Sequence, residues 1–337
     1  MLPSVQPGSF VTSVMIVNER AKGTIKRPKT LRAVIESLPG CRVFSTKSAD
    51  ALEGIIRFCL EQEVGVVVLY GGDGTLSCAL TTFFLAYREA KRPLPVFAPL
   101  MAGTMNTVVK GLGLKGNVVD IARRLKGAIL ERRLLSVTEH EPLVVEGGGE
   151  TLRIGFVGGV GLPASFLGHY YALGAKGPVD GLRTALELIG SVIARGEFAK
   201  RLLAPLPIEV LADEERLDLG PVCACLFGKV KSVGIKAKPL YFAPPPLGSI
   251  AYVATDFRPM KILKKVIPVF MGNRLGESGF CEGRASQIEL SSKSVKELEV
   301  MVDGDVLSAK MPLCVHPGPL VRLFNPLFPQ KEHLYRD

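Results

Sequence analysis

The sequence lacks any long apolar run, and this absence excludes a membrane-spanning helix. No stretch approaches the roughly 18 uninterrupted apolar residues that such a helix needs. The best candidate, residues 182–194, is short and contains Arg183 and Glu187. The N-terminus also lacks a basic segment ahead of an apolar core, so we do not expect a secretory signal peptide. These absences favour a cytoplasmic protein.

Paired metal-ligand spacings are missing as well. The seven cysteines are scattered, and only Cys223 and Cys225 alternate within one strand-like segment. No second Cys or His pair lies near them in the sequence, so buried reduced thiols are favoured over a metal site, although the metal site stays open as an alternative.

A basic tract is also absent, although the chain is basic overall. The formal net charge is +10, which suits an anionic nucleotide, an acidic membrane surface or nucleic acid. The basic residues occur in separated pairs without interleaved aromatic residues, which argues against nucleic acid. We therefore expect attraction to an acidic membrane surface, with an ordinary solvated positive face as the simpler alternative.

What the sequence does contain is a buried strand that runs into a glycine-rich turn. Residues 64–70 are almost all apolar, residues 71–75 read GGDGT, and an apolar segment of helical spacing follows. A β-branched run without polar alternation is typical of a central strand in a parallel sheet. A glycine turn between a strand and a helix N-terminus forms an anion site suited to phosphates. Asp73 would then face Mg²⁺, a hydroxyl or an amide donor, whereas in the alternative it only caps the following helix in a tight turn.

A change of sequence pattern after residue 131 predicts two domains, and the length of 337 residues also favours two. Up to residue 131, strands alternate with helices, which predicts a parallel α/β domain with ligand loops at the carboxyl ends of its strands. Residues 132–317 contain short alternating runs separated by turns, which predicts an antiparallel β-sandwich domain. A helical excursion interrupts it at residues 163–203. Residues 238–248, with four prolines, are expected to form a loop.

Three motifs together resemble those of the diacylglycerol kinase catalytic domain superfamily. They are GGDGT at residues 71–75, GTMN at residues 103–106 and VDGD at residues 302–305, which is similar to that family's DGE motif. The likeness is closest to the small bacterial lipid kinases and covers almost the whole chain; sphingosine and ceramide kinases are relatives. NAD kinases share GGDGT, but the Asn-Glu motif expected of them is not found.

The resemblance implies an ATP-dependent lipid kinase, with nucleotide bound between an α/β domain and a lipid-binding β-sandwich. It also implies that residues 318–337 return to pack on the first domain. The nucleotide-binding residues implied are Asn18, Thr46, Gly71, Gly72, Asp73, Gly74, Thr75, Leu76, Ser77, Gly103, Thr104 and Asn106. The catalytic residues implied are Asp73, Asp303 and Asp305.

Simpler interpretations exist for several of these positions. Asn18 and Thr46 are common strand-end residues, and residues 103–104 fit an ordinary helix cap. Asp303 and Gly304, between two alternating runs, are typical of a β-hairpin turn. A hairpin tip aimed into the cleft would satisfy both interpretations.

The sequence departs from the family pattern in several places. Residues 19–21 lack the hydroxyl residue usual in the first loop, Ser77 stands where Asn is common, and Asp305 replaces a Glu. The bacterial enzymes bind a structural Mg²⁺ with an Asp-Gly segment. The similar stretch here, residues 245–248, reads PPLG, and Leu247 cannot ligate a metal.

The function expected is transfer of the γ-phosphate of ATP to a lipid hydroxyl, with diacylglycerol or a related lipid as acceptor. ATP and Mg²⁺ are the expected cofactors, and the lipid is presented at a membrane surface to a peripherally associated protein. Asp303 or Asp305 would accept the hydroxyl proton. The alternatives are a nucleotide- or lipid-binding protein that has lost catalysis, and an NAD kinase-like enzyme. The lipid and the oligomeric state, including a homodimer, stay open.

Overall fold

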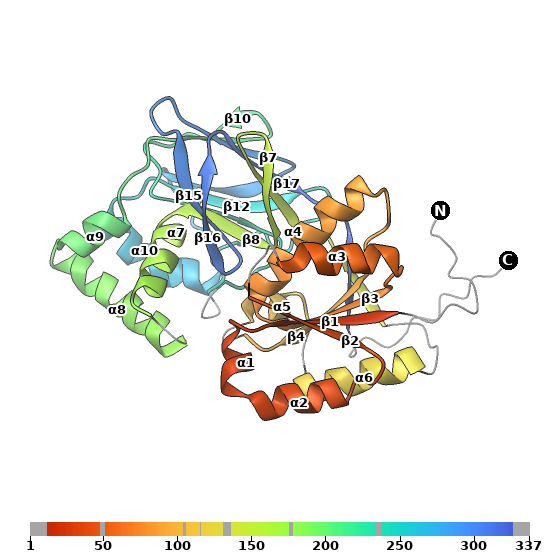
Figure 1. The fold of residues 1–337 in the computed structure, drawn as a ribbon. Coiled ribbons are helices and arrows are strands. Elements are labelled where there is room, and N and C mark those ends of the chain that lie inside the picture. The colour runs from red at the N-terminus through yellow and green to blue at the C-terminus, as the bar shows by residue number, and fades with distance from the viewer. Residues whose placement is uncertain are drawn as a thin grey trace.

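The computed structural model describes residues 12–47, 51–103, 106–114, 116–130, 136–174, 178–233 and 237–325. In these residues an N-terminal α/β part is followed by two antiparallel sheets that pack against each other (Figure 1). This arrangement confirms the fold class expected from the sequence.

The first sheet has six strands and is mostly parallel. Its spatial order is β2 (Arg42–Thr46), β1 (Ser13–Asn18), β3 (Val66–Gly71), β4 (Val96–Met101), β18 (Val321–Phe324) and β5 (Val137–His140). Only β5 is antiparallel to its neighbour. Every residue of β3 is buried, as its unbroken apolar run predicts.

Helices cover both faces of this sheet. They are α1 (Lys22–Lys26), α2 (Pro28–Glu36), α3 (Ala51–Glu61), α4 (Asp73–Glu89), α5 (Thr107–Gly111) and α6 (Val118–Leu130). One apolar core joins the sheet to α2 and α6, and another joins it to α3, α4 and α5. The loops at the carboxyl ends of β1 to β4 consequently converge on one edge, as the alternating pattern predicts.

The other two sheets each have six antiparallel strands. The first runs β10 (Glu215–Arg216), β9 (Glu209–Ala212), β14 (Ile288–Ser291), β17 (Leu313–Pro317), β6 (Leu143–Gly147) and β7 (Glu150–Gly155). The second runs β13 (Phe280–Ala285), β12 (Ile250–Thr255), β11 (Ala224–Gly228), β8 (Val157–Gly161), β15 (Glu297–Val302) and β16 (Asp305–Lys310). Alternate side chains of both sheets meet in a common core.

Four helices border the second of these sheets. The expected helical excursion contains α7 (Leu162–Ala172), α8 (Pro178–Ile193) and α9 (Glu197–Leu202). A further helix, α10 (Pro259–Met271), was not expected, because Pro268 interrupts an otherwise helical pattern. It packs against α8, far away in the sequence. None of the helices in the described residues is both long and apolar enough to cross a membrane.

The chain passes between the two parts more than once. β5 pairs with β18 in the first sheet, so the chain leaves that sheet at Glu141 and Pro142 before β6 begins. β18 returns to the first sheet between β4 and β5. Residues 326–337, included in the expected return segment, lie outside the described part. One apolar core spans both parts, because Leu80 and Phe83 of α4 share it with Ile154 and Phe156.

Candidate active site

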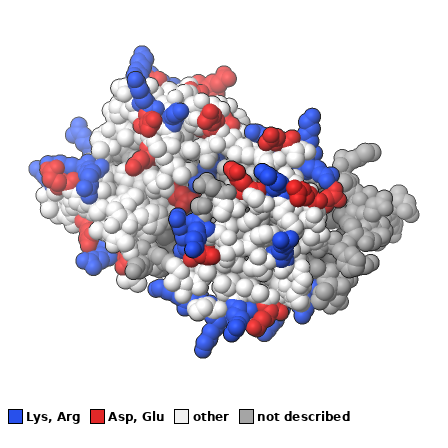
Figure 2. Space-filling view, in the orientation of Figure 1, with Lys and Arg blue, Asp and Glu red and all other residues white. Residues whose placement is uncertain are grey.

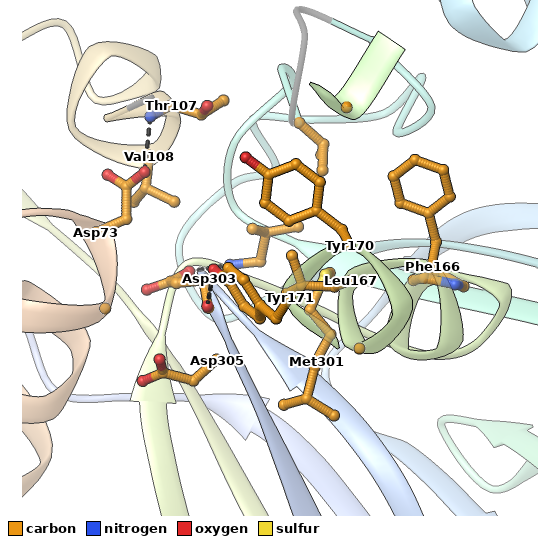
Figure 3. A pocket seen from close by; sticks show the side chains of 18 of the residues that line it. Asp73, Thr107, Val108, Phe166, Leu167, Tyr170, Tyr171, Met301, Asp303 and Asp305 are labelled. Carbon is orange, nitrogen blue, oxygen red and sulfur yellow. Dashed lines mark hydrogen bonds between the residues drawn. The ribbon is translucent and has the colours of Figure 1, made fainter. Parts of the chain in front are cut away.

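A large cavity runs along the junction between the first sheet and the second antiparallel sheet. Its volume is about 1280 Å³. The loops after β1, β2, β3 and β4 line its polar end, and α7, α8 and α10 line its apolar end. The tip of the β15–β16 hairpin lines the cavity too, and Figure 3 shows it between Asp73 and the aromatic side chains of α7.

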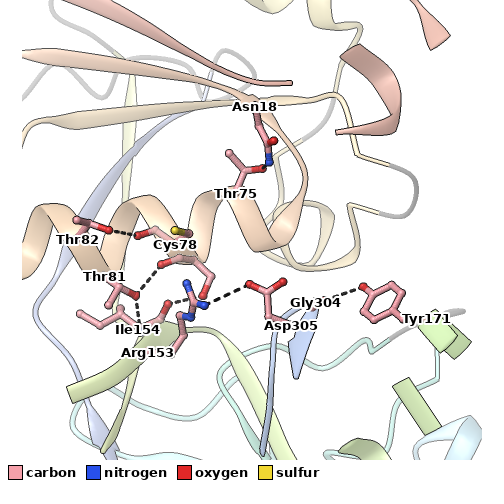
Figure 4. Close-up of polar contacts among 11 residues, drawn as sticks. Asn18, Thr75, Cys78, Thr81, Thr82, Arg153, Ile154, Tyr171, Gly304 and Asp305 are labelled. Atoms are coloured by element: carbon pink, nitrogen blue, oxygen red, sulfur yellow. Dashed lines mark hydrogen bonds and ion pairs between the residues drawn. The ribbon is translucent and has the colours of Figure 1, made fainter. Parts of the chain in front are cut away.

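The GGDGT turn connects β3 to α4 and is held by Thr75. The Thr75 hydroxyl accepts hydrogen bonds from the Gly72 N–H (3.3 Å) and from Asn18 Nδ2 (2.8 Å; Figure 4). A Cβ at Gly71 would lie 2.2 Å from Thr75 Oγ1, so only glycine fits there. Thr75, in the first turn of α4, therefore closes the N-terminus of this helix by accepting the Gly72 N–H, and it also ties the turn to the end of β1.

The second glycine loop lies directly against the first. A Cβ at Gly103 would lie 2.5 Å from Gly72 Cα, so the two backbones touch. Asn106, at φ 50°, accepts the Gly103 N–H through Oδ1 (3.1 Å) and donates to the Gly103 carbonyl through Nδ2 (3.0 Å). These bonds fix the loop in a compact form. Thr104 lies outside the described residues.

Asp73 links the two loops. Its Oδ2 accepts the Thr107 N–H at 2.7 Å and its Oδ1 accepts the Val109 N–H at 3.2 Å, so the carboxylate caps α5 (Figure 3). Burial raises the pKa of Asp73, and the backbone N–H groups of Val109, Thr107 and Val108 oppose that shift. Asp73 lines the cavity, but its oxygens already accept these N–H groups. Asp73 therefore faces amide donors, one of the expected contacts, and these bonds cap α5 and not the helix α4 that follows the turn.

The remaining first-domain candidates divide into two groups. Asn18 and Thr46 are register partners at the ends of β1 and β2, and both line the cavity. Leu76 and Ser77 point away from it: Leu76 is buried in the core, and the Ser77 hydroxyl donates to the Ile154 carbonyl at 2.7 Å. Their side chains bind α4 to β7 and leave only their backbone near the turn.

Asp303 occupies the β15–β16 turn with φ 53°, in agreement with the hairpin interpretation. Its Oδ1 accepts the N–H groups of Phe156 (2.8 Å) and Val157 (3.0 Å), while its buried Oδ2 has no hydrogen-bond partner. Burial is the largest cause that raises the pKa of Asp303 to about 8, and the charges of Asp73 and Asp305 add to it. Asp303 is therefore mostly protonated at neutral pH.

Asp305 lies open to the cavity beside the glycine turn. A Cβ at Gly74 would lie 3.0 Å from Asp305 Oδ1, so the turn and the acidic hairpin, 231 positions apart in the sequence (74 to 305), meet across the cavity. Arg153 Nη2 lies 3.5 Å from Asp305 Oδ2 (Figure 4), and the Asp305 side chain is 40% exposed. The Asp303 and Asp305 carboxylates thus differ sharply in environment.

Several residues that shape the cavity were not found from the sequence. Arg153 is one: its side chain is 14% exposed, and its buried Nε has no partner. Tyr171 is another, since its hydroxyl donates to the Gly304 carbonyl at 2.6 Å. The third is the cavity-lining face of α10. A lone Arg in a strand and a lone Tyr in a helix carry no motif, so no sequence signal could have identified them.

The apolar end of the cavity is built by three helices and the sheet beneath them. Figure 3 shows Phe166 and Tyr170 of α7 near Met301 of β15. The lining side chains contributed by α8 and α10 are Gly181, Ala185, Leu188, Ile189, Val192, Pro259, Ile262, Leu263, Val266, Val269 and Phe270. None of these side chains is charged, so this end suits a hydrocarbon chain.

The described residues do not fit the structural Mg²⁺ that the family resemblance raises. They contain no group of three or more His, Cys, Asp or Glu side chains able to hold a metal ion. Next to Leu247, the Lys229 ammonium bonds to the Glu141 carboxylate and to the Ser249 carbonyl (2.5 Å). Glu141 also accepts the Gly248 N–H at 2.9 Å. This loop is therefore held by a buried lysine, whose pKa burial lowers against the opposing effect of Glu141.

Cys223 and Cys225 behave as core thiols. Both are buried, and burial raises the pKa of each to about 12, so neither is a thiolate at neutral pH. The Cys223 thiol donates to the Thr255 and Phe257 carbonyls.

Comparisons with known proteins concern the family and the fold. Residues 12–137 match the sequence model of the family described as the diacylglycerol kinase catalytic domain. Comparison with curated proteins gives no match. Among solved structures, a Bacillus anthracis (strain Sterne) protein described provisionally as a diacylglycerol kinase is 17% identical with a TM-score of 0.66, covering 94% of this chain and 98% of its own.

A second Bacillus anthracis structure, described as a diacylglycerol kinase, is 16% identical with a TM-score of 0.59, covering 94% of this chain and 97% of its own. At this identity the two structures support the fold alone. The match over residues 12–137 is to the family that the sequence motifs resemble, so the expected family resemblance is borne out over that part of the chain.

Proposed function

We propose that the protein is an ATP-dependent lipid kinase, which transfers the γ-phosphoryl group of ATP to the hydroxyl of diacylglycerol or a related lipid. One observation carries this proposal: the cavity joins two glycine loops at its polar end to an uncharged helical chamber at the other, and Asp305 lies where the two meet. A phosphate donor and an apolar acceptor could occupy the two ends together. The family match supports a kinase but does not identify the lipid.

The glycine loops are the proposed phosphate site. Gly72, Gly74 and Gly103 all line the cavity, and the absence of their side chains lets the two loops and Asp305 pack closely together. Phosphate would bind to backbone N–H groups at this end, beside the N-terminus of α4. Asn18 and Thr46 border the same end. Asp73 would act as a positioning residue, because its bonds to Thr107 and Val109 hold the second loop against the first. Mg²⁺ would enter with ATP and neutralise phosphate charge.

For the acceptor hydroxyl, the geometry favours Asp305. Its carboxylate is partly exposed beside Gly74, whereas the Asp303 oxygens are buried and Oδ1 already accepts two N–H groups. Asp305 would align the hydroxyl and accept its proton late in the transfer, while Asp303 fixes the hairpin. The pKa of about 8 at Asp303 favours the opposite assignment, since a base works best near the operating pH.

The net positive charge and the apolar chamber also support the membrane as the source of the lipid. With a net charge of +10, the protein would associate peripherally with acidic membranes, as a cytoplasmic enzyme of phospholipid metabolism. On the face drawn in Figure 2, Lys and Arg are interspersed with Asp and Glu, so the positive charge is not gathered in one patch there.

The test is to incubate the purified protein with labelled ATP, Mg²⁺ and a panel of diacylglycerol, sphingosine, ceramide and NAD. A labelled lipid supports the proposal. Binding of ATP or lipid without product indicates a binding protein, and labelled NADP indicates an NAD kinase.

Variants of the two carboxylates then assign their roles. Asp305→Asn should lower kcat by roughly 10²-fold or more, because the aligned base is lost. Asp305→Glu should keep the carboxylate and most of the activity. If Asp303→Asn abolishes turnover while Asp305→Asn leaves it intact, the proton acceptor is Asp303 instead.

A further inference from the structure

Two helices beside the apolar chamber expose apolar side chains that nothing in the described structure covers. On α8 these are Val179 (79% exposed), Leu182 (51%), Leu186 (58%) and Ile193 (63%). On α10 they are Met260 (43%), Ile267 (71%) and Met271 (64%). Exposed apolar side chains at this density on neighbouring helices mark an interaction surface.

Each set forms a stripe along its helix. The α8 residues follow spacings of three, four and seven, so they share one face, and the α10 residues follow a spacing of seven and four. Neither stripe belongs to the lining of the cavity, which is contributed by other positions of the same helices. The stripes instead adjoin that lining: Val266 and Phe270 both line the cavity and are 38% and 37% exposed.

The positive charge near the stripes is concentrated on α10. Residues 258–274 contain five Lys or Arg and no Asp or Glu, and of these Lys261 and Lys265 pair with Glu277 and Arg274 pairs with Glu282. The charges on α8 are balanced more evenly. Lys264 lies within the α10 stripe, between Met260 and Ile267 in the helical sequence, and is itself exposed. Exposed aliphatic residues among excess Lys and Arg are typical of a helix that inserts shallowly into an anionic bilayer.

We propose that the exposed stripes of α8 and α10 form a docking surface for an anionic lipid bilayer, and that lipid enters the apolar chamber between them. This inference rests on the proposed function, because the lipid acceptor of that kinase reaction would enter the chamber directly from the bilayer. An acyl chain that moves from the bilayer past Val266 and Phe270 stays in apolar surroundings, so it avoids the cost of exposure to water.

The experiment measures binding to sedimented vesicles of phosphatidylglycerol and phosphatidylcholine. Wild type should bind, with a partition that falls as salt is added. Leu186→Glu and Ile267→Glu should each reduce the partition by roughly 10-fold or more, because each replaces an inserting side chain by a like charge. Ile25→Glu is the matched control: Ile25 is 67% exposed but lies on α1, and this variant should bind like wild type.

A second measurement separates this proposal from the kinase proposal. With dioctanoylglycerol below its aggregation limit, Leu186→Glu and Ile267→Glu should phosphorylate as well as wild type, because neither residue lines the cavity. If no lipid is phosphorylated, the proposed function fails, while the vesicle result still decides the docking surface.

The docking surface would be contradicted if wild type does not bind vesicles, or if the Glu variants bind them as well as wild type does. A further outcome combines the absence of vesicle binding by wild type with a dimer in sedimentation velocity that both variants convert to monomer. The last outcome would assign the stripes to contacts between two copies of the chain.

Discussion

At the scale of single residues, the site depends on carboxylates that sit close together in different surroundings. Asp303 is buried with one unpartnered oxygen, Asp305 is partly exposed next to Arg153, and Asp73 accepts backbone N–H groups. Burial, together with the charges of Asp73 and Asp305, raises the pKa of Asp303. The titration of Asp303 therefore links pH to stability.

The first prediction concerns pH and Asp303. Because its folded pKa of about 8 exceeds its unfolded value of 3.8, the native state holds one more proton than the unfolded state between these values. Protonation of Asp303 thus stabilises the folded state, fully below about pH 4, and this stabilisation is lost as pH rises to about 8. The free energy of unfolding of Asp303→Asn relative to wild type should rise from pH 5 to pH 8 and then level off, as measured by urea unfolding.

Asp213→Asn provides the control for that measurement. The Ser286 hydroxyl lowers the pKa of Asp213, so its linked stability is lost only as pH falls through a folded pKa below 3.8. The free energy of unfolding of Asp213→Asn relative to wild type should therefore not change between pH 5 and pH 9. If the free energy of unfolding relative to wild type changes with pH in the same way for both variants, Asp303 is ionised at neutral pH.

The second prediction concerns Lys229. Its side chain is 7% exposed and that of Glu141 is 13% exposed, so removing the ammonium leaves a buried carboxylate without its charge partner. Lys229→Met should lower the free energy of unfolding by about 3–5 kcal/mol, whereas Lys229→Met with Glu141→Gln should recover much of that loss. Neither Mg²⁺ nor a chelator should change the wild-type melting temperature in the absence of nucleotide.

An exposed pair serves as the comparison. Lys200 and Glu197 form a salt bridge in which the side chains are 64% and 88% exposed. Lys200→Met should change stability by no more than about 0.5 kcal/mol. A melting temperature of wild type that rises with Mg²⁺, or a Lys229→Met variant as stable as wild type, would disprove the role given to Lys229.

At the scale of elements, the β15–β16 hairpin is positioned by α7. The Tyr171 hydroxyl bonds to the Gly304 carbonyl, and the Asp303 amide donates to the Val157 carbonyl at 2.8 Å, so helix and sheet hold the turn from two sides. Removing the hydroxyl loosens one of these attachments and lets Asp305 shift.

The third prediction follows from this attachment. Tyr171→Phe should cost about 1 kcal/mol of stability, since one hydrogen bond is lost. It should also lower kcat about 10-fold, because the carboxylate is misplaced, with little change in KM for ATP. Amides of residues 302–306 should exchange faster with deuterium. Tyr241→Phe, at a 42% exposed tyrosine that packs on Phe242, is the control; the idea fails if both variants behave alike.

At the scale of the whole molecule, the two parts share an apolar core. Phe156 is fully buried in a cluster that also contains Val67 of β3, Leu80 of α4 and Val230 after β11. The chain also returns through β18 to the first sheet. Separate unfolding of either part would expose this shared surface.

The fourth prediction is therefore a single unfolding transition in calorimetry. Phe156→Ala should shift that transition as a whole and lower stability by about 3–5 kcal/mol. Two resolved transitions in wild type, with only one shifted in the variant, would mean that the two parts unfold independently.

Local chemistry allowed much of this protein to be anticipated from its sequence. The unbroken apolar run of β3, the glycine turn capped by Thr75 and the Asp303–Gly304 hairpin each depend on neighbours a few residues away. Backbone conformation and short-range hydrogen bonds follow from such neighbours, so the fold class and the main loops could be predicted. α10 was missed because Pro268 disturbs its local pattern.

Only the tertiary structure decided which distant residues meet. The capping of α5 by Asp73, the pairing of Arg153 with Asp305 and the bond between Lys229 and Glu141 join residues 34, 152 and 88 positions apart. Such contacts depend on how whole sheets and helices pack, and no spacing rule encodes them. The sequence by itself determined the strands, turns and family, whereas long-range packing determined the ionisation of Asp303, the chamber formed by α7, α8 and α10, and the surface these helices leave exposed.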